Sequence, residues 1–222
     1  MKTLLAWSSG KDSAWTLHAL RRQNVEVGAL LTTINEAAGR VAMHGVRRSL
    51  VEAQSEAVGV PLWKVPLPFP CTNEDYESRM AEACRRAVAE GFDSIAFGDL
   101  YLRDVREYRE QRLAGSGLTP LFPLWGIPTP QLAREMIGAG LRAWVTCVDS
   151  RVLDGGFAGR EFDRALLADL PERIDPCGEN GEFHTFVCDG PMFRAPVGVE
   201  AGEIRKIDGF VYADLLPIRA LS

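Results

Sequence analysis

The first thirteen residues constrain the fold more than any other part of this chain. An apolar run, Thr3 to Trp7, has the character of a buried strand, and the small residues Ser8 to Gly10 follow it at once. A helical pattern begins directly afterwards, with Asp12 or Ser13 available as its cap. A helix that starts there presents free N–H groups and its positive dipole end at the strand's carboxyl end. The stretch therefore predicts a phosphate-binding loop at 8–13.

Two better-known phosphate loops do not fit this stretch. The P-loop needs four residues between its glycines and then a Lys-Ser/Thr pair, whereas here Gly10-Lys11 is followed by Asp12 without an upstream glycine, and there is no G-x-G-x-x-G. The segment Ser8-Ser-Gly-Lys-Asp-Ser13 instead resembles the PP-loop, S-G-G-x-D-S, of the N-type ATP pyrophosphatases, which cleave ATP between the α- and β-phosphates. Ser9 replaces the first glycine, and a positive φ there would strain it by about 1 kcal/mol. An ordinary turn before a helix is the alternative.

Helical and strand patterns alternate along the first 122 residues. Strands separated by helices form a parallel sheet that is covered on both faces, and ligands bind at the carboxyl ends of its strands. Thr33, at the end of the second strand, and the Gly98-Asp99 pair, after the fourth, should therefore lie at one rim with the 8–13 loop. We expect strands at 3–7, 25–33, 62–65, 94–97 and 119–122, and helices at 11–23, 46–58, 73–90 and 102–113.

A cluster of proline and glycine at 120–130 is the expected domain boundary. It divides the chain into a first domain at 1–125 and a smaller α/β domain at 126–222. In the second domain we expect a helix at 129–140 with Thr129 as its cap, a strand at 143–148, a helix at 161–170, and strands at 183–188 and 204–216.

Composition excludes several classes of protein. The chain has 222 residues, of which 46% are hydrophobic, so it can bury a substantial core. No apolar run approaches the roughly 20 residues that span a bilayer, and we expect a cytoplasmic protein without a membrane partner. A net charge of -5 makes nucleic acid an unlikely partner, while a homodimer is compatible with the sequence. Five scattered cysteines without a C-x-x-C motif indicate neither a disulfide framework nor a zinc ribbon.

A second informative stretch runs from Pro176 to Pro191. It gathers Glu179, Asn180, Glu182 and His184 within six residues, next to three glycines and before an apolar strand. A turn followed by a strand would need the glycines and the asparagine but not both carboxylates and the imidazole. A zinc site lacks the usual ligand spacing here, and a histidine of the core is the alternative for the imidazole.

Together these stretches resemble the diphthine-ammonia ligase family and its close ATP-pyrophosphatase relatives, over nearly the whole chain. The resemblance implies an adenine nucleotide α-hydrolase-like sandwich, with a five-stranded parallel sheet, followed by a small α/β domain that faces the substrate. The segment Leu100 to Arg109 departs from the stretch that is typical of diphthine ligases, so the resemblance indicates the family and not the acceptor. The matching segments are Ser8–Ser13, Gly98-Asp99, Pro123–Trp125, Cys177–Thr185 and Asp189–Pro191.

The resemblance implies an ATP-dependent ligase that adenylates a carboxylate acceptor, releases pyrophosphate, and forms an amide with ammonia or an amine. Backbone N–H groups and hydroxyls of the 8–13 loop would hold the phosphates, and Mg²⁺ would bind Asp12 and Asp99. One of Glu182 or His184 would take a proton from the attacking ammonium. The expected ATP-binding residues are Ser8, Ser9, Gly10, Lys11, Asp12, Ser13, Thr33 and Gly98. Glu179, Asn180, Glu182 and His184 are expected to bind the acceptor, and Lys11, Asp12, Glu182 and His184 to be catalytic.

Two other functions remain open at this level. Enzymes that thiolate tRNA also use a PP-loop, but they require a cysteine pair to carry the sulfur and a basic surface to bind the tRNA. The sequence has neither. A nucleotide-binding module without turnover would not require Asp12, Asp99 and the second-domain motif together.

Overall fold

The computed structural model of the protein describes residues 1–42 and 44–218. Its first unit is built on a six-stranded sheet, of which five strands are parallel, as the alternating pattern predicts. In this sheet β1 lies between β2 and β5, β5 also pairs with β6, and β2 also pairs with β4. The parallel strands are β1 (Lys2–Ala6), β2 (Glu26–Asn35), β4 (Leu62–Leu67), β5 (Ser94–Ala96) and β6 (Thr119–Leu121).

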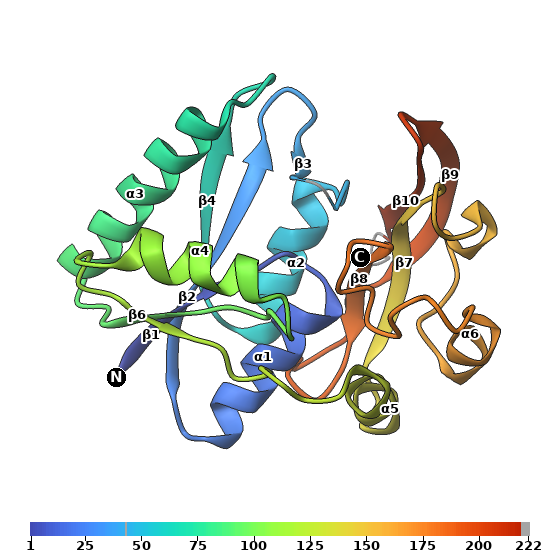
Figure 1. The fold of residues 1–222 in the computed structure, drawn as a ribbon, viewed down its shortest axis with the longest axis horizontal. Coiled ribbons are helices and arrows are strands. Elements are labelled where there is room, and N and C mark those ends of the chain that lie inside the picture. The colour runs from blue at the N-terminus through green and yellow to red at the C-terminus, as the bar shows by residue number, and fades with distance from the viewer. Residues whose placement is uncertain (43, 219–222) are drawn as a thin grey trace.

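Four helices cover the two faces of this sheet. They are α1 (Lys11–Arg22), α2 (Arg48–Val58), α3 (Asn73–Ala89) and α4 (Arg103–Leu113). In Figure 1, α3 and α4 lie on one face, and α1 and α2 lie on the other, between the parallel sheet and a second sheet. Successive strand residues point to opposite faces, so Leu4 packs in the core under α3 while Leu5 packs in the core around α1 and α2.

The second sheet has four antiparallel strands in the order β8-β7-β10-β9. Its strands are β7 (Arg142–Asp149), β8 (Phe183–Asp189), β9 (Val199–Ile207) and β10 (Phe210–Pro217), and it is accompanied by α5 (Thr129–Gly138), α6 (Arg164–Asp169) and a short 3₁₀ turn at Gly155–Phe157. The mixed α/β class, with a parallel sheet and a smaller second α/β unit, is therefore confirmed. One hydrophobic cluster includes buried residues of both sheets, among them Leu5 and Phe186.

Local details differ from the sequence prediction at four places. The strand expected at 204–216 is the hairpin of β9 and β10, because the chain turns at Asp208 and Gly209. The helix at 129–140 begins after Pro128, and the Thr129 hydroxyl donates to Asp175 (2.6 Å) instead of capping the helix. The helix expected from 161 is shorter, because Asp163 caps it by accepting from the N–H of Leu166. A two-residue strand, β3 (Arg40–Val41), pairs antiparallel with β2 and was not expected. In the described ranges 1–42 and 44–218, no helix combines the length and apolar character needed to cross a membrane.

Candidate functional site

The 8–13 loop connects the carboxyl end of β1 to α1, as predicted. Ser9 has a φ of 73°, so it occupies the left-handed conformation for which the PP-loop pattern carries glycine. The predicted cap is wrong: Gly10 is the N-cap of α1 and receives no side-chain cap. The Ser13 hydroxyl instead donates to the carbonyl of Gly10 (2.9 Å) and lies 3.3 Å from the hydroxyl of Ser8. The first N–H groups of α1 therefore face the crevice without a capping side chain from the loop.

Gln54 of α2 holds the 8–13 loop in place through side-chain hydrogen bonds, and it was not among the residues predicted from the sequence. It is fully buried, and its amide accepts a hydrogen bond from the Trp7 indole (2.9 Å). The same amide donates to the carbonyls of Ser9 (3.0 Å) and Val187 (2.6 Å). The N–H of Val187 also donates to Ser9 (3.0 Å), so the left-handed residue is held by both α2 and β8. The only sequence signal was a lone polar residue on the apolar face of α2.

Lys11 joins the loop to the second unit. Only 2% of its surface is exposed, and its ammonium group donates to Asp12 (2.8 Å) and to the carbonyl of Cys177. Its backbone N–H donates to the Thr185 hydroxyl (3.1 Å). Burial alone would lower the pKa of Lys11, but the charge of Asp12 raises it, so the ammonium stays protonated. The positive charge is thus fixed where the two units meet.

The rim after β5 lies against the loop, as expected. A Cβ atom on Gly98 would lie 3.0 Å from the Asp12 backbone, so any larger residue would push the loop away from the rim. Asp99 follows, but both its oxygens accept hydrogen bonds from Arg109 (2.6 and 3.0 Å). Thr33 is partly exposed at the end of β2, and its carbonyl accepts from the N–H of Ala42 (3.1 Å). Asp99 as a metal ligand and Thr33 as a nucleotide contact stay predictions.

Three buried polar atoms at this rim have no hydrogen-bond partner among the residues that the structure describes. They are Ser9 Oγ, Asp12 Oδ1 and Thr32 Oγ1. Buried polar atoms are nearly always paired, so such a group is typical of a place that a ligand completes. The free carboxylate oxygen of Asp12 fits Mg²⁺, which binds through one or two carboxylates together with substrate phosphates. The described part of the chain contains no cluster of three or more His, Cys, Asp or Glu side chains that could hold a metal ion.

The loop at 175–182 is organised by Glu182. Its carboxylate accepts from the N–H groups of Asp175 (3.1 Å) and Asn180 (3.0 Å) and from the Asn180 amide (2.9 Å). A carboxylate engaged in this way is poorly placed to accept a proton from an amine. Glu179 extends from the same loop to the rim after β5, where it accepts from the N–H of Leu100 (2.7 Å). Burial, together with the charge of Asp12, raises the pKa of Glu179 to about 7 despite that hydrogen bond.

His184 lies on β8 and has a partner that the sequence analysis missed. Its ring centroid is 4.5 Å from that of His44, which lies in the segment between β3 and α2. Burial and then the charge of Lys11 lower the pKa of His184 to about 4, so the imidazole is neutral at pH 7. A lone histidine in a polar segment gave no periodicity or spacing from which this pairing could be recognised.

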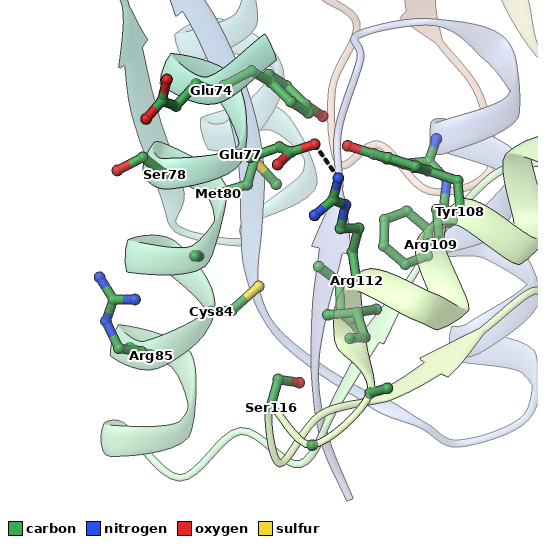
Figure 2. Close-up of a pocket in the computed structure, with 17 residues that line it drawn as sticks. Glu74, Glu77, Ser78, Met80, Cys84, Arg85, Tyr108, Arg109, Arg112 and Ser116 are labelled. Carbon is green, nitrogen blue, oxygen red and sulfur yellow. Dashed lines mark hydrogen bonds and ion pairs between the residues drawn. The ribbon is translucent and has the colours of Figure 1, made fainter.

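Two cavities flank the site. The larger one, of about 580 Å³, lies between α3 and α4 over Ile95 and Phe97 of the sheet, and Figure 2 shows Glu77 and Arg112 joined across it. Arg109, the partner of Asp99, lines this cavity. The smaller one, of about 390 Å³, lies between the β2–β3 segment and the second sheet. Its lining includes Ala42, Gly45 and Thr146. The Thr146 hydroxyl donates a hydrogen bond to the carbonyl of His184 (3.4 Å).

Comparison with known families agrees with the arrangement of the two units. The model of the diphthamide synthase N-terminal domain matches residues 1–120, and that of the diphthamide synthase C-terminal domain matches residues 128–214. The chain belongs to the diphthamide synthase family. Among curated proteins, family members named diphthine–ammonia ligase align with the whole chain: the cattle protein at 23% identity over 91% of its length, the human protein at 24% over 91%, and the rat protein at 28% over 92%.

One solved structure shows a weaker likeness to this family member. It is titled as the predicted subunit of a tRNA methyltransferase from Methanocaldococcus jannaschii DSM. The alignment covers 89% of this chain and 100% of that chain, with 14% sequence identity and a TM-score of 0.45. A likeness of this size carries no argument about function.

Proposed function

We propose that this protein is an ATP-dependent, amide-forming ligase. It transfers AMP from ATP to a carboxylate acceptor and then replaces the AMP with ammonia or another amine. The observation that carries this proposal is the junction at Lys11, where the PP-loop meets the 175–185 segment of the second unit. Such a junction brings a polyphosphate site and an acceptor site to the same charged group. The relatives named for diphthine and ammonia perform a reaction of this class.

In the first half-reaction, a carboxylate oxygen attacks the α-phosphorus, the bond to the β-phosphate oxygen breaks, and pyrophosphate leaves with the electron pair. The N–H groups that follow Lys11 in the first turn of α1 stabilise the growing charge of the leaving group, together with the ammonium of Lys11. The hydroxyls of Ser8 and Ser9 add hydrogen bonds to phosphate oxygens, and that of Ser13 can join them only by giving up its hydrogen bond to the carbonyl of Gly10. Bound Mg²⁺ would supply further positive charge, with Asp12 as its ligand. Asp99 can join it only by giving up contacts with Arg109.

In the second half-reaction, ammonia forms the C–N bond, AMP leaves the acyl carbon with the electron pair, and the nitrogen passes a proton to the phosphate group of the departing AMP. The 175–185 segment positions the acceptor for this step. Asn180 is held by Glu182, and Glu179 lies against the rim after β5. The cavity of about 390 Å³ between the two units is a suitable acceptor pocket, since ligand pockets of roughly 300–1,000 Å³ are usual.

The division of the chain at residues 125 and 126 is part of the same proposal. The first domain, 1–125, would bind ATP, and the second, 126–222, would bind the acceptor. The limits of the two family models, at residues 120 and 128, support this division.

The products of ATP turnover test the proposed reaction. With a carboxylate acceptor and ammonium, the protein should release AMP and pyrophosphate, which chromatography separates from ADP and phosphate. Asp12→Asn should lower the rate at least a hundredfold, whereas Asp104→Asn, the same change at an exposed position of α4, should leave it unchanged. Formation of ADP would refute the proposal. ATP binding without any product, across a panel of carboxylates and in a cell extract searched by mass spectrometry for new amides, would favour a binding module.

A further inference from the structure

The ammonium group of Lys11 is held by the second unit as well as by its own loop. It donates to the carbonyl of Cys177, and it lies 5.7 Å and 5.5 Å from the ring centroids of Phe162 and Phe183. Asp12 is its other hydrogen-bond partner among the residues that the structure describes (2.8 Å). Because an ammonium group has three N–H bonds, one of them stays available for a phosphate oxygen. The direction of that N–H depends on where the Cys177 carbonyl lies.

The Cys177 carbonyl is placed by a turn that Asp175 closes. The Oδ1 atom of Asp175 accepts from the N–H groups of Cys177 (2.8 Å) and Glu179 (3.3 Å). The backbone carbonyl of Asp175 accepts from the N–H of Gly178 (2.8 Å). That N–H belongs to the same planar peptide group as the Cys177 carbonyl, so holding one fixes the direction of the other. Asp175 therefore determines where the carbonyl meets Lys11.

Asp175 is in turn oriented by the start of α5. The hydroxyl of Thr129, which is buried, donates to the other carboxylate oxygen, Oδ2 (2.6 Å). The backbone carbonyl of Thr129 accepts from the thiol of Cys177 (3.6 Å). Burial raises the pKa of this thiol well above its usual range, so it stays protonated and remains a donor. Both oxygens of Asp175 are thus engaged in holding the turn, and α5 fixes the turn from its other side.

We propose that Asp175 is a positioning residue for the Lys11 ammonium. Through the Cys177 carbonyl it directs one N–H of Lys11 to the phosphate chain of a nucleoside triphosphate bound at the PP-loop, and Thr129 keeps Asp175 in the required orientation. The inference rests on the proposed function, because it needs a nucleotide at this loop. Since the same oxygen of Asp175 also accepts the N–H of Glu179, one side chain anchors both the cation of the nucleotide site and the start of the acceptor segment.

A double-mutant cycle on the full-length protein tests whether Asp175 acts through Lys11. Calorimetry measures the binding of α,β-methylene ATP, which cannot be cleaved between those phosphates, in the presence of Mg²⁺. Asp175→Ala should weaken this binding about tenfold in the wild-type background, but by less than about twofold when Lys11→Met is already present. Methionine keeps the length of Lys11 and fits beside the two aromatic rings, but it has neither the charge nor an N–H. A purely structural role of Asp175 would instead give the same loss in both backgrounds.

Two further variants show whether the hydrogen bonds of Asp175 are responsible. Asp175→Asn keeps one oxygen for the N–H groups of Cys177 and Glu179, and its amide can donate to the Thr129 hydroxyl, so it should bind the analogue within about threefold of the wild type. Asp154→Ala is the matched control. Asp154 accepts the N–H of Gly156 (2.7 Å) in a similar turn, at an exposed position outside the 8–13 loop and the 175–185 segment, so this variant should bind like the wild type.

The outcomes separate the inference from the proposed function. Wild-type affinity in Asp175→Ala, or equal losses with and without Lys11→Met, overturns the inference and leaves the proposed function standing. Absence of analogue binding by the wild-type protein overturns the proposed function, and the inference with it. If Asp175→Ala does not fold, Thr129→Val replaces it in the cycle: it should weaken binding about threefold, and Thr129→Ser, which keeps the hydroxyl, should restore it. Wild-type affinity in Thr129→Val would then overturn the inference.

Discussion

Ser9 has two features that cost stability, a buried hydroxyl without a partner and a left-handed backbone, and two substitutions measure their effects separately. Its hydroxyl is buried without a partner, and its backbone has a φ of 73°. Ser9→Ala removes the buried hydroxyl, for which mutational data give a cost of about 1–3 kcal/mol, and keeps the strained Cβ. Ser9→Gly also removes the left-handed strain of about 1–2 kcal/mol, at the expense of about 0.4–1 kcal/mol of unfolded-chain entropy. We therefore expect both variants to be more stable than the wild type by about 1 kcal/mol or more, with the glycine variant the more stable.

The same substitutions should weaken ATP binding, because in the proposed function the hydroxyl meets a phosphate oxygen. We expect a three- to tenfold loss of affinity for Mg²⁺-ATP by calorimetry in both variants. Stability is measured by urea unfolding, with tryptophan fluorescence reporting on the buried Trp7. Ser49→Ala, at an exposed position of α2, is the control and should change stability by less than about 0.5 kcal/mol. A Ser9→Ala variant that is less stable than the wild type, or that binds ATP unchanged, would refute the reasoning.

Three further predictions concern the supports of the loop and the pH dependence of folding. Gln54→Leu removes the partner of the Trp7 indole N–H and one donor each from the carbonyls of Ser9 and Val187, so it should cost about 2–4 kcal/mol of unfolding free energy. Gln111→Leu, at an exposed position of α4, should cost almost nothing in the same urea titration. Gly98→Ala places a Cβ 3.0 Å from the Asp12 backbone and should weaken ATP binding at least tenfold; unchanged affinity would show that the loop can move aside. Because the pKa of His184 is lowered to about 4, the unfolded chain binds a proton between pH 6.5 and 4 that the native state refuses. His184 therefore lowers stability on acidification through this window by up to about 3 kcal/mol. Glu179, with its pKa raised to about 7, acts in the opposite sense, and His44, with its lowered pKa, acts in the same sense. Both groups are present in the wild type and in His184→Gln, so the test is the difference between the two pH profiles: the wild type should lose more stability than the variant, and equal slopes would contradict the assignment.

The sequence was sufficient for the fold because its strongest signals are local. The alternating apolar runs and amphipathic stretches predicted the five parallel strands and the helices between them, to within a few residues. The two-residue strand β3 was missed, since it depends on pairing with the end of β2 and has no periodicity of its own. The start of the helix at Arg164 was missed for another reason. The helical sequence pattern extends back to residue 161, but the side chain of Asp163 accepts a hydrogen bond from the N–H of Leu166 and so begins the helix later.

The candidate site was predictable only where a motif occupies consecutive residues. The PP-loop was found in this way, together with the positive φ at Ser9 that its pattern required. Gln54 and His44 could not be found, because each acts through a partner more than a hundred positions away in the chain: Val187 for the amide and His184 for the imidazole. Glu182 was found, but its expected role as a base depends on whether its oxygens are free to accept a proton. Three donors from its own loop already bind these oxygens.

These contacts have a consequence for how the site forms. The carbonyl of Ser9 is held by Gln54 and by the N–H of Val187, and the N–H of Lys11 is held by Thr185, so the loop takes its shape from β8 as well as from its own unit. A hydrophobic cluster shared by the two sheets makes their separation costly, since every apolar group it buries would return to water. The phosphate loop is therefore completed only when the second sheet is in place. If the second unit binds the acceptor, as proposed, the acceptor would meet a nucleotide site that the same sheet has helped to build, and one set of hydrogen bonds would then couple the two half-reactions.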